Sequence, residues 1–272
     1  MMPAVSVIVC CYNAERFVEE TLRSVRAQTF QDYELILVND GSTDGTHDAL
    51  LKAQGESPSN TRIVSRRVNG GLPAARNSGK DAAAGRFHLY LDADDLLPPT
   101  ALEDHLKAIE GAEVSYAGFE RFTDDPMQTS GRFEKLLPEV DTLATLLVAG
   151  TDADSWWVPP GAVMVRSAFA HDISWSHHVP ITNDLHYYAC LLHKGAKFVS
   201  TGTIGLKYRM HDKSLSRSNP LGLCAESLWL ADHWIEKVGP LPKLVQRKRE
   251  TLGFMRSYAN IELETMLAAR SV

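Results

Sequence analysis

The first 120 residues alternate short apolar runs with longer stretches of helical periodicity. The apolar runs are VSVIVCC from Val5, YELILVND from Tyr33, RIVSR from Arg62, FHLYLDAD from Phe87 and EVSYAGF from Glu113. They are rich in Val, Ile and Leu and lack the apolar-polar alternation of a half-exposed strand, which is typical of parallel strands covered on both faces. The sequence therefore predicts an α/β fold with a mostly parallel, doubly wound sheet.

After residue 120 the pattern becomes more mixed. It predicts a hairpin or loop at 124–131, helices at 141–149 and 183–193, strands at 161–167 and 204–211, and a mobile polar loop at 212–221. Two helices, at 223–238 and 242–269, end the chain. We expect one domain over 1–215, with halves at 1–120 and 121–215, and a helical extension over 216–272. The last helix could serve a homodimer, a membrane surface or simple packing.

Composition narrows the class of protein. The net charge is −6, so a nucleic-acid partner, which calls for a basic surface, is not supported. The four cysteines form no CxxC pair, so neither a zinc cage nor a disulfide framework is expected. No apolar run approaches the roughly 18 residues that span a bilayer. The sequence predicts a cytoplasmic protein and leaves open a peripheral contact with the inner face of the membrane.

Polar residues follow the apolar runs. Ligands of such sheets bind outside the carboxyl ends of the strands, so these residues are expected to form one site. They are Tyr12, Asn13 and Glu15 after the first run, Asp40 with Gly41 and Ser42 after the second, residues 66–71 after the third, and Asp92, Ala93, Asp94 and Asp95 after the fourth. For Asp40 the alternative is a tight turn in which Ser42 or Asp44 caps the next helix.

The acids after the fourth run have two interpretations. Asp92 and Asp94, two residues apart, can converge on Mg²⁺ or Mn²⁺, hard ions that prefer oxygen ligands shared with phosphates. Alternatively the acids cap the helix announced by LLPPTALEDHL, since acidic residues suit a helix start. We expect Asp94 to be the metal ligand, Asp92 to share the site, and Asp95 to begin the helix.

Other candidates lie further along the chain. The loop VNGGLPAARNSG leads into a helix whose backbone N–H groups and Arg76 suit a phosphate, although an ordinary connection is the alternative. His211 precedes the polar loop and suits a phosphate or metal, but a surface histidine is the common case. Asp184 begins a helix and is either a general base or a helix-terminal charge.

Taken together, these segments resemble a known family. SVIVCCYNAE, ELILVNDGSTDGT, NGGLPAARNSG, LYLDADD, ITNDLHYYACLLHKGAKF and YRMHDKSLS occur in that order. They are similar to the motifs of the family 2 inverting glycosyltransferases, which have the glycosyltransferase A fold. The resemblance covers roughly the first 215 residues.

The resemblance implies a nucleotide-diphosphate sugar donor, usually a UDP-sugar, bound by the half at 1–120, and a carbohydrate or glycoconjugate acceptor bound by the half at 121–215. It implies that Asp40 accepts from the uracil imide, that Asp94 binds Mg²⁺ or Mn²⁺, and that His211 supports the metal or the diphosphate. The remaining donor residues would be Tyr12, Asn13 and Glu15 at the base and ribose, Asn69, Gly71, Arg76 and Asn77 along the nucleotide and sugar cleft, and Asp92 with Ala93 at the ribose or metal.

The family's catalytic base is usually the second acid of a pair, which points to Asp184. This chain departs from the family there, because Asn183 replaces the first acid. We expect Asp184 to deprotonate an acceptor hydroxyl in a single inverting displacement, while the metal and Arg76 or His211 offset charge on the leaving diphosphate. Trp156 and Trp157 either stack on an acceptor sugar or pack in the core.

Three alternatives compete with a transferase. A nucleotide-sugar-binding protein of the same fold would keep the site without the chemistry. A sugar nucleotidyltransferase would need an early glycine-rich signature with Lys or Arg, which SVIVCCYNAE does not supply. A NAD-dependent dehydrogenase would need GxGxxG after the first strand, which is also missing.

Overall fold

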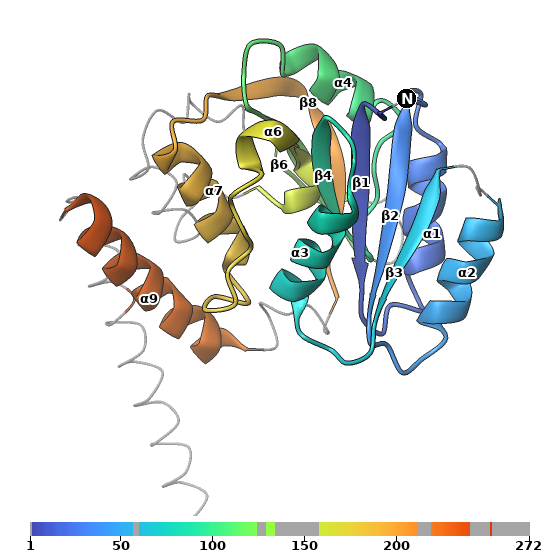
Figure 1. The fold of residues 1–272 in the computed structure, drawn as a ribbon, viewed down its shortest axis with the longest axis horizontal. Helices are drawn as coiled ribbons and strands as arrows, with labels where there is room; N and C mark the ends of the chain where they lie inside the picture. Colours follow the sequence, from blue (N-terminus) through green and yellow to red (C-terminus); the bar gives the residue numbers. More distant parts are fainter. Residues whose placement is uncertain are drawn as a thin grey trace, which may run out of the picture.

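A computed structural model describes residues 2–56, 60–123, 129–133, 158–211, 219–239 and 251. Within these residues eight strands form one sheet in the order β3-β2-β1-β4-β7-β5-β6, with β8 paired to β5 (Figure 1). The strands are β1 (Val5–Cys11), β2 (Tyr33–Asp40), β3 (Thr61–Arg66), β4 (Phe87–Asp92), β5 (Val114–Phe122), β6 (Thr129–Phe133), β7 (Val163–Arg166) and β8 (Phe198–Arg209).

Pairing directions divide the sheet. The strands β1 to β4 are parallel to one another, and β8 is parallel to β5. The short strand β7 runs antiparallel between β4 and β5, and β6 forms an antiparallel edge on β5. The predicted mostly parallel α/β sheet is confirmed, and the carboxyl ends of β1, β2, β3 and β4 lie along one edge.

Helices cover both faces of the sheet (Figure 1). The helix α3 packs so closely on one face that a Cβ on Gly79 would lie 2.3 Å from Ile8 Cγ2 and 3.1 Å from Val38 Cγ2. The helices α1 and α2 contact each other and cover the opposite face. The helix bounds are α1 (Val18–Arg26), α2 (Thr46–Glu56), α3 (Leu72–Ala82), α4 (Ala101–Ala108), α6 (Ser167–Ala170), α7 (Asn183–His193) and α9 (Pro220–Val238), with a 3₁₀ turn at Pro160–Ala162.

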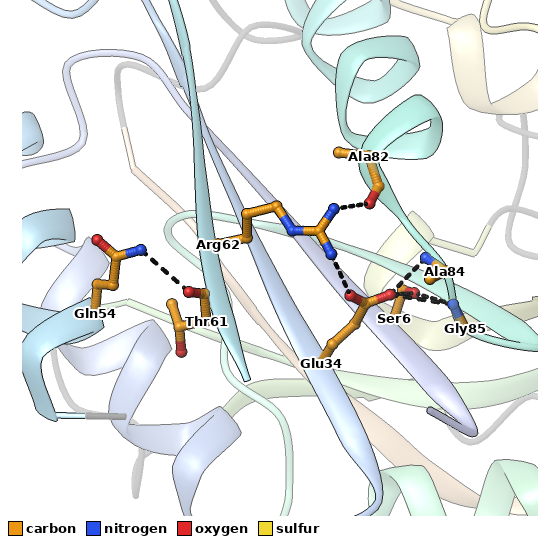
Figure 2. A network of polar contacts seen from close by, with 8 residues as sticks. All are labelled: Ser6, Glu34, Gln54, Thr61, Arg62, Ala82, Ala84 and Gly85. Atoms are coloured by element: carbon orange, nitrogen blue, oxygen red, sulfur yellow. Dashed lines mark hydrogen bonds and ion pairs between the residues drawn. The ribbon is translucent and has the colours of Figure 1, made fainter. Parts of the chain in front are cut away.

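A buried carboxylate fixes the end of α3 to the sheet. Glu34 Oε1 accepts from Ser6 Oγ at 2.6 Å and from the backbone N–H groups of Ala84 at 2.6 Å and Gly85 at 3.1 Å (Figure 2). Arg62 completes the network by donating to Glu34 Oε2 at 3.4 Å and to the Ala82 carbonyl at 2.8 Å. The network lies at the amino ends of the strands, opposite the edge where the site residues gather, and it holds the C-terminal end of α3 to the sheet.

The helix α9 belongs to the main core. It lies beside α7, on the side of the sheet away from β3 (Figure 1), and its Leu230, Ala231 and Trp234 are buried in the central apolar cluster. No helix in the described parts of the chain is long and apolar enough to cross a membrane. Several expectations fall outside the described residues, namely the helix at 141–149, Trp156, Trp157, most of the polar loop at 212–221, and the last helix except for residue 251.

Candidate active site

The loops after β1 and β2 are joined by side-chain hydrogen bonds. Asn13, whose φ is +48°, accepts through Oδ1 from the Thr43 N–H at 2.9 Å, and its own N–H donates to Ser42 Oγ at 3.1 Å. Glu15 Oε2 accepts from the Gly45 N–H at 2.9 Å. Both side chains therefore hold the two loops together, whereas the neighbouring Tyr12 ring is 48% exposed and accessible to a ligand.

Asp40 connects the ends of β2 and β3 to the glycine loop. Its buried carboxylate accepts from Arg66 Nη1 at 2.5 Å and from the Gly70 N–H at 3.1 and 3.2 Å. At Gly41, where φ is +70°, a Cβ would lie 2.7 Å from the Asn69 nitrogen, so the loops approach as closely as only glycine allows. The predicted group of Asp40, Asn69 and Gly71 is thus brought together, with Asn69 Oδ1 accepting from the Gly71 N–H at 2.8 Å.

Arg76 connects three elements at the centre of the edge. From α3 its Nη2 donates to Asp92 Oδ1 at 2.6 Å, and its Nη1 donates to Asn183 Oδ1 at 2.6 Å. Its guanidinium also lies 4.5 Å from the ring centroid of Trp175, a cation-π distance. Burial alone would lower the pKa of Arg76, but Asp92, Cys10 and Asp184 together outweigh burial and raise it, so the side chain stays charged.

Asn77 makes a reciprocal pair of backbone contacts. Its Nδ2 donates to the Trp175 carbonyl at 2.9 Å, and its Oδ1 accepts from the Trp175 N–H at 2.9 Å. The Trp175 ring is fully buried and stacks on Tyr187 at 4.1 Å between centroids. Asn77 therefore fixes the indole beneath Arg76, and a contact between Asn77 and a nucleotide stays a prediction.

The acidic turn after β4 separates its carboxylates. Asp94 Oδ2 lies 2.7 Å from His211 Nε2, and the His211 ring stacks on Phe17 at 4.9 Å. Asp92 forms an ion pair with Arg76. Burial raises the pKa of Asp92, Arg76 lowers it and Asp94 raises it, and the net effect is an increase. Arg209 fixes the turn by donating from Nε to the Asp94 carbonyl at 2.8 Å.

The expectation that Asp95 begins a helix is wrong. The helix α4 begins at Ala101 with Thr100 as its N-cap, six residues after Asp95. Asp95 is 1% exposed, and its Oδ1 accepts from the Arg209 N–H at 2.8 Å. Burial and the charges of Asp94 and Asp92 raise the pKa of Asp95 well above its usual value. Asp95 is a buried anchor for β8.

Asp184 lies in the first turn of α7 and is 8% exposed. Its Oδ1 accepts from the Leu185 N–H at 2.8 Å, and its charge is close enough to act on Arg76. Tyr208 of β8 also senses the charge of Asp184. Burial raises the pKa of Tyr208, and so do the charges of Asp95, Asp92, Asp94 and Asp184. The base predicted from the late motif therefore lies within electrostatic reach of the same side chains as the acids that follow β4, and its role stays a prediction.

The donor set fits a divalent cation. In the described ranges no three His, Cys, Asp or Glu side chains converge in a way that would hold a metal by themselves. Asp94 and His211 nevertheless form a contacting, partly exposed pair, with side chains 30% and 17% exposed. Mg²⁺ takes one or two protein ligands and completes its shell with water and phosphate oxygens, so a two-residue set suits a metal bound together with a diphosphate.

Two residues that contact this site, Trp175 and Glu226, were not predicted from the sequence. Trp175 supports Arg76 from a segment that carries no strand or helix signal. Glu226 of α9 accepts hydrogen bonds from Ile181 and Thr182, just before α7. No local signal identifies either residue, because each acts through a contact with a distant part of the chain.

The family can be assigned by comparison with known proteins. The sequence model of glycosyl transferase family 2 matches residues 6–160, more than half of the chain. The chain belongs to glycosyl transferase family 2. The matched segment includes β1 to β4 and every predicted donor residue before the acceptor half, while Asp184, His211 and α9 lie beyond it.

Relatives agree with this assignment of the family 2 chain. It is 38% identical over 106 residues to the chondroitin synthase of Pasteurella multocida, an alignment that covers 39% of this chain and 11% of that protein. The chain spans about a third of the length of the first curated relatives it matches.

Solved structures show the same fold. S. aureus TarS 1-349 in complex with UDP matches with a TM-score of 0.67 at 21% identity, over 92% of this chain and 70% of that one. The mannosyltransferase PcManGT from Pyrobaculum calidifontis, in complex with GDP-Man and Mn²⁺, matches with a TM-score of 0.67 at 16% identity, over all of this chain and 81% of that one. The family 2 chain therefore has the glycosyltransferase A-type fold.

Proposed function

We propose that this glycosyltransferase is an inverting, metal-assisted enzyme that moves a sugar from a nucleotide-diphosphate donor to a hydroxyl group, with Asp184 as general base. The observation that carries the proposal is the gathering of Asp184, Arg76 and the Asp94–His211 pair at the carboxyl edge of the sheet. In this proposal residues 1–120 bind the donor, residues 121–215 bind the acceptor, and 216–272 extend the domain.

A UDP-sugar is the proposed donor class. TarS is described in complex with UDP and with UDP-GlcNAc, and PcManGT with GDP-Man, so both nucleotides suit this fold. In this chain the exposed Tyr12 ring and the Asp40 carboxylate lie at neighbouring strand ends, where a base could stack on the ring and donate an imide N–H to the acid. Arg66, paired with Asp40, would hold that carboxylate at the strand end.

Asp94 and His211 are the residues that would hold the cation, with Asp92 beside them. When bound, Mn²⁺ or Mg²⁺ would supply positive charge that neutralises the charge on the leaving diphosphate. His211 would also donate a hydrogen bond to a phosphate when it is not occupied by Asp94. Arg209 keeps the turn that carries Asp94 in place by its contact with the Asp94 carbonyl.

The proposed transfer is a single displacement that needs one base. The acceptor oxygen attacks the anomeric carbon, the bond from that carbon to the β-phosphate oxygen breaks, and the nucleoside diphosphate leaves with the electron pair. The acceptor proton passes to the Asp184 carboxylate. Arg76 donates from Nη1 to Asn183 and from Nη2 to Asp92, so in this proposal it holds β4 and α7 at a fixed separation.

A growing glycan is the proposed acceptor, because the chondroitin synthase relative makes a polysaccharide. Lipid-linked glycans and small hydroxyl compounds belong to the same chemical class of acceptor. Stacking of an acceptor sugar on Trp156 or Trp157 stays a prediction, since both lie outside the described residues.

The test uses the full-length chain with a panel of UDP- and GDP-sugars, with Mn²⁺, with Mg²⁺ and with a chelator. We expect one nucleotide diphosphate to bind in a metal-dependent way, and the product linkage to have the anomeric configuration opposite to that of the donor, as read by NMR. Retained configuration would contradict the single displacement. Tight, metal-dependent binding with no transfer to any acceptor or to water would favour a nucleotide-sugar-binding protein instead.

A further inference from the structure

The carboxylate of Glu226 meets the start of α7 from a different element. Its Oε2 accepts from the Thr182 N–H at 2.7 Å, from Thr182 Oγ1 at 3.0 Å and from the Ile181 N–H at 2.9 Å, and its Oε1 lies 3.1 Å from the same Ile181 nitrogen. Thr182 is the N-cap of α7, and its own side chain makes no capping bond. A residue 44 positions away therefore accepts from the N–H of the N-cap residue, as the N3 acid of a capping box does.

The segment held by Glu226 carries the site. Asn183 and Asp184 follow Thr182 directly, and Asn183 is fixed from the other side, because its Oδ1 accepts from Arg76 and its Nδ2 donates to the Pro180 carbonyl. The N-terminal end of α7 is thus hydrogen-bonded to Arg76 of α3 and to Glu226 of α9, and Asp184 lies in its first turn.

The helix α9 provides a firm base for this contact. Its Trp234 is fully buried, and its Trp229 stacks on His178 at 5.6 Å and lies 5.7 Å from the ring of His186 on α7. Asn219 caps α9 by accepting from the Gly222 N–H at 2.9 Å. Because α9 is fixed in the core, the Glu226 carboxylate cannot move with residues 181 and 182. Its hydrogen bonds therefore restrain the start of α7.

Glu226 is buried, and a buried acid is an unusual choice if its only purpose is to stabilise the fold. It is 9% exposed, and burying a charged group is costly unless it is well hydrogen-bonded. Burial raises the pKa of Glu226, the hydrogen bonds from Thr182 and Ile181 lower it, and the charge of Asp184 raises it further. The last effect shows that the two acids lie within electrostatic reach of each other.

We infer that Glu226 is a positioning residue for the transfer reaction: it fixes the N-terminal turn of α7 so that the Asp184 carboxylate is held where it can take the acceptor proton. This rests on the proposed function, because it takes Asp184 as the base. It also makes α9, which lies beyond the segment matched by the family, a part of the catalytic unit.

The kinetic test compares Glu226→Gln with the wild-type chain at full length. The Gln amide keeps one acceptor oxygen but presents N–H groups toward the N–H groups of Ile181 and Thr182, so the turn loosens. We expect kcat to fall roughly 10- to 100-fold, as small misplacements of a catalytic group do, while donor KM and nucleotide-diphosphate affinity stay within about twofold. Glu226→Asp should recover part of kcat. Glu236→Gln, an exposed acid on the same helix, is the matched control and should behave as wild type.

A second readout needs no activity. Hydrogen exchange of a peptide spanning 178–186 should accelerate at least about tenfold in Glu226→Gln, with β1 to β4 peptides unchanged. Wild-type kcat in Glu226→Gln, or unchanged exchange at 178–186, would overturn the inference. A parallel fall of kcat, donor affinity and thermal stability would also overturn it, since that is general destabilisation. If the wild-type chain transfers no sugar, the proposed function fails on its own, and the exchange experiment still decides whether Glu226 orders the turn.

Discussion

Asp94 and Asp95 are identical neighbours with opposite surroundings. The Asp94 side chain is 30% exposed and contacts His211 at the site edge. Asp95 is buried, its Oδ1 binds the Arg209 N–H, and its Oδ2 has no hydrogen-bond partner among the described residues. Burial chiefly raises the pKa of Asp95 well above its usual value and so favours its neutral form, whereas Asp94 lies at the site edge, where a ligand can reach it.

Amide substitutions should separate the two acids. Asp95→Asn keeps the acceptor for Arg209 and changes no net charge if the acid is protonated, so we expect a change in unfolding free energy below about 1 kcal/mol and unchanged nucleotide binding. Asp94→Asn removes a hard oxygen ligand and should weaken Mn²⁺-dependent binding of the nucleotide diphosphate by about tenfold or more in calorimetry. Equal losses in the two variants would show that the acids are not distinguished in this way.

These residue roles could be predicted only where the partner is local. The identity of the strand ends follows from the apolar runs, so Asp40, Asp92 and Asp94 were placed at one edge from sequence alone. The burial of Asp95 depends on its hydrogen bond with Arg209, 114 residues further on. The hydrogen bond from Arg76 to Asn183 joins residues that are 107 positions apart. No local pattern encodes such pairings, which arise when β8 and α7 pack against the sheet.

Elements were predicted best where their signal is periodic and undisturbed. The helix predicted at 183–193 has those bounds as α7, while the strand predicted from residue 204 is longer, because β8 already begins at Phe198 in a polar stretch paired with β5. The helix announced by LLPPTALEDHL begins only at Ala101, since Pro98 and Pro99 belong to the turn that precedes its cap. Local propensity sets the type of element, and tertiary pairing sets its ends.

The network around Glu34 should stabilise the α3 connection measurably. Glu34→Ala removes the acceptor of the Ala84 N–H and of the Ser6 hydroxyl, while the Gly85 N–H keeps Ser6 Oγ at 2.8 Å (Figure 2). We expect a loss of about 2–4 kcal/mol in unfolding free energy, measured by urea titration, because each unsatisfied buried donor costs about 1–3 kcal/mol. Glu19→Ala, which removes an exposed ion pair with Lys52, should cost less than about 1 kcal/mol. Similar losses would mean that the network adds little.

Stability of the whole molecule should depend on pH through its buried histidines. His105 of α4 is fully buried and contacts Ser115 Oγ at 2.9 Å, and burial lowers its pKa to about 3. The unfolded chain binds this proton below about pH 6.5 and the folded chain does not, so the stabilising effect is complete above pH 6.5 and declines as pH falls toward 3.

A substitution isolates this contribution from the other acids and bases. The stability advantage of the wild-type chain over His105→Gln should shrink by about 1.4 kcal/mol per pH unit at most between pH 6.5 and 4.5, in denaturant titrations at each pH. A difference that stays constant over this range would show that His105 takes up its proton in the folded state as readily as in the unfolded one.

The central claim is that one carboxylate of α7 removes the acceptor proton at a site built by the strand ends. The most direct measurement is kcat and nucleotide-diphosphate affinity of Asp184→Asn at full length, beside Asp172→Asn, which changes an exposed acid next to Lys194. We predict that Asp184→Asn lowers kcat roughly 10²- to 10⁴-fold, keeps nucleotide affinity within about twofold, and that Asp172→Asn matches wild type. Wild-type turnover in Asp184→Asn would contradict the account.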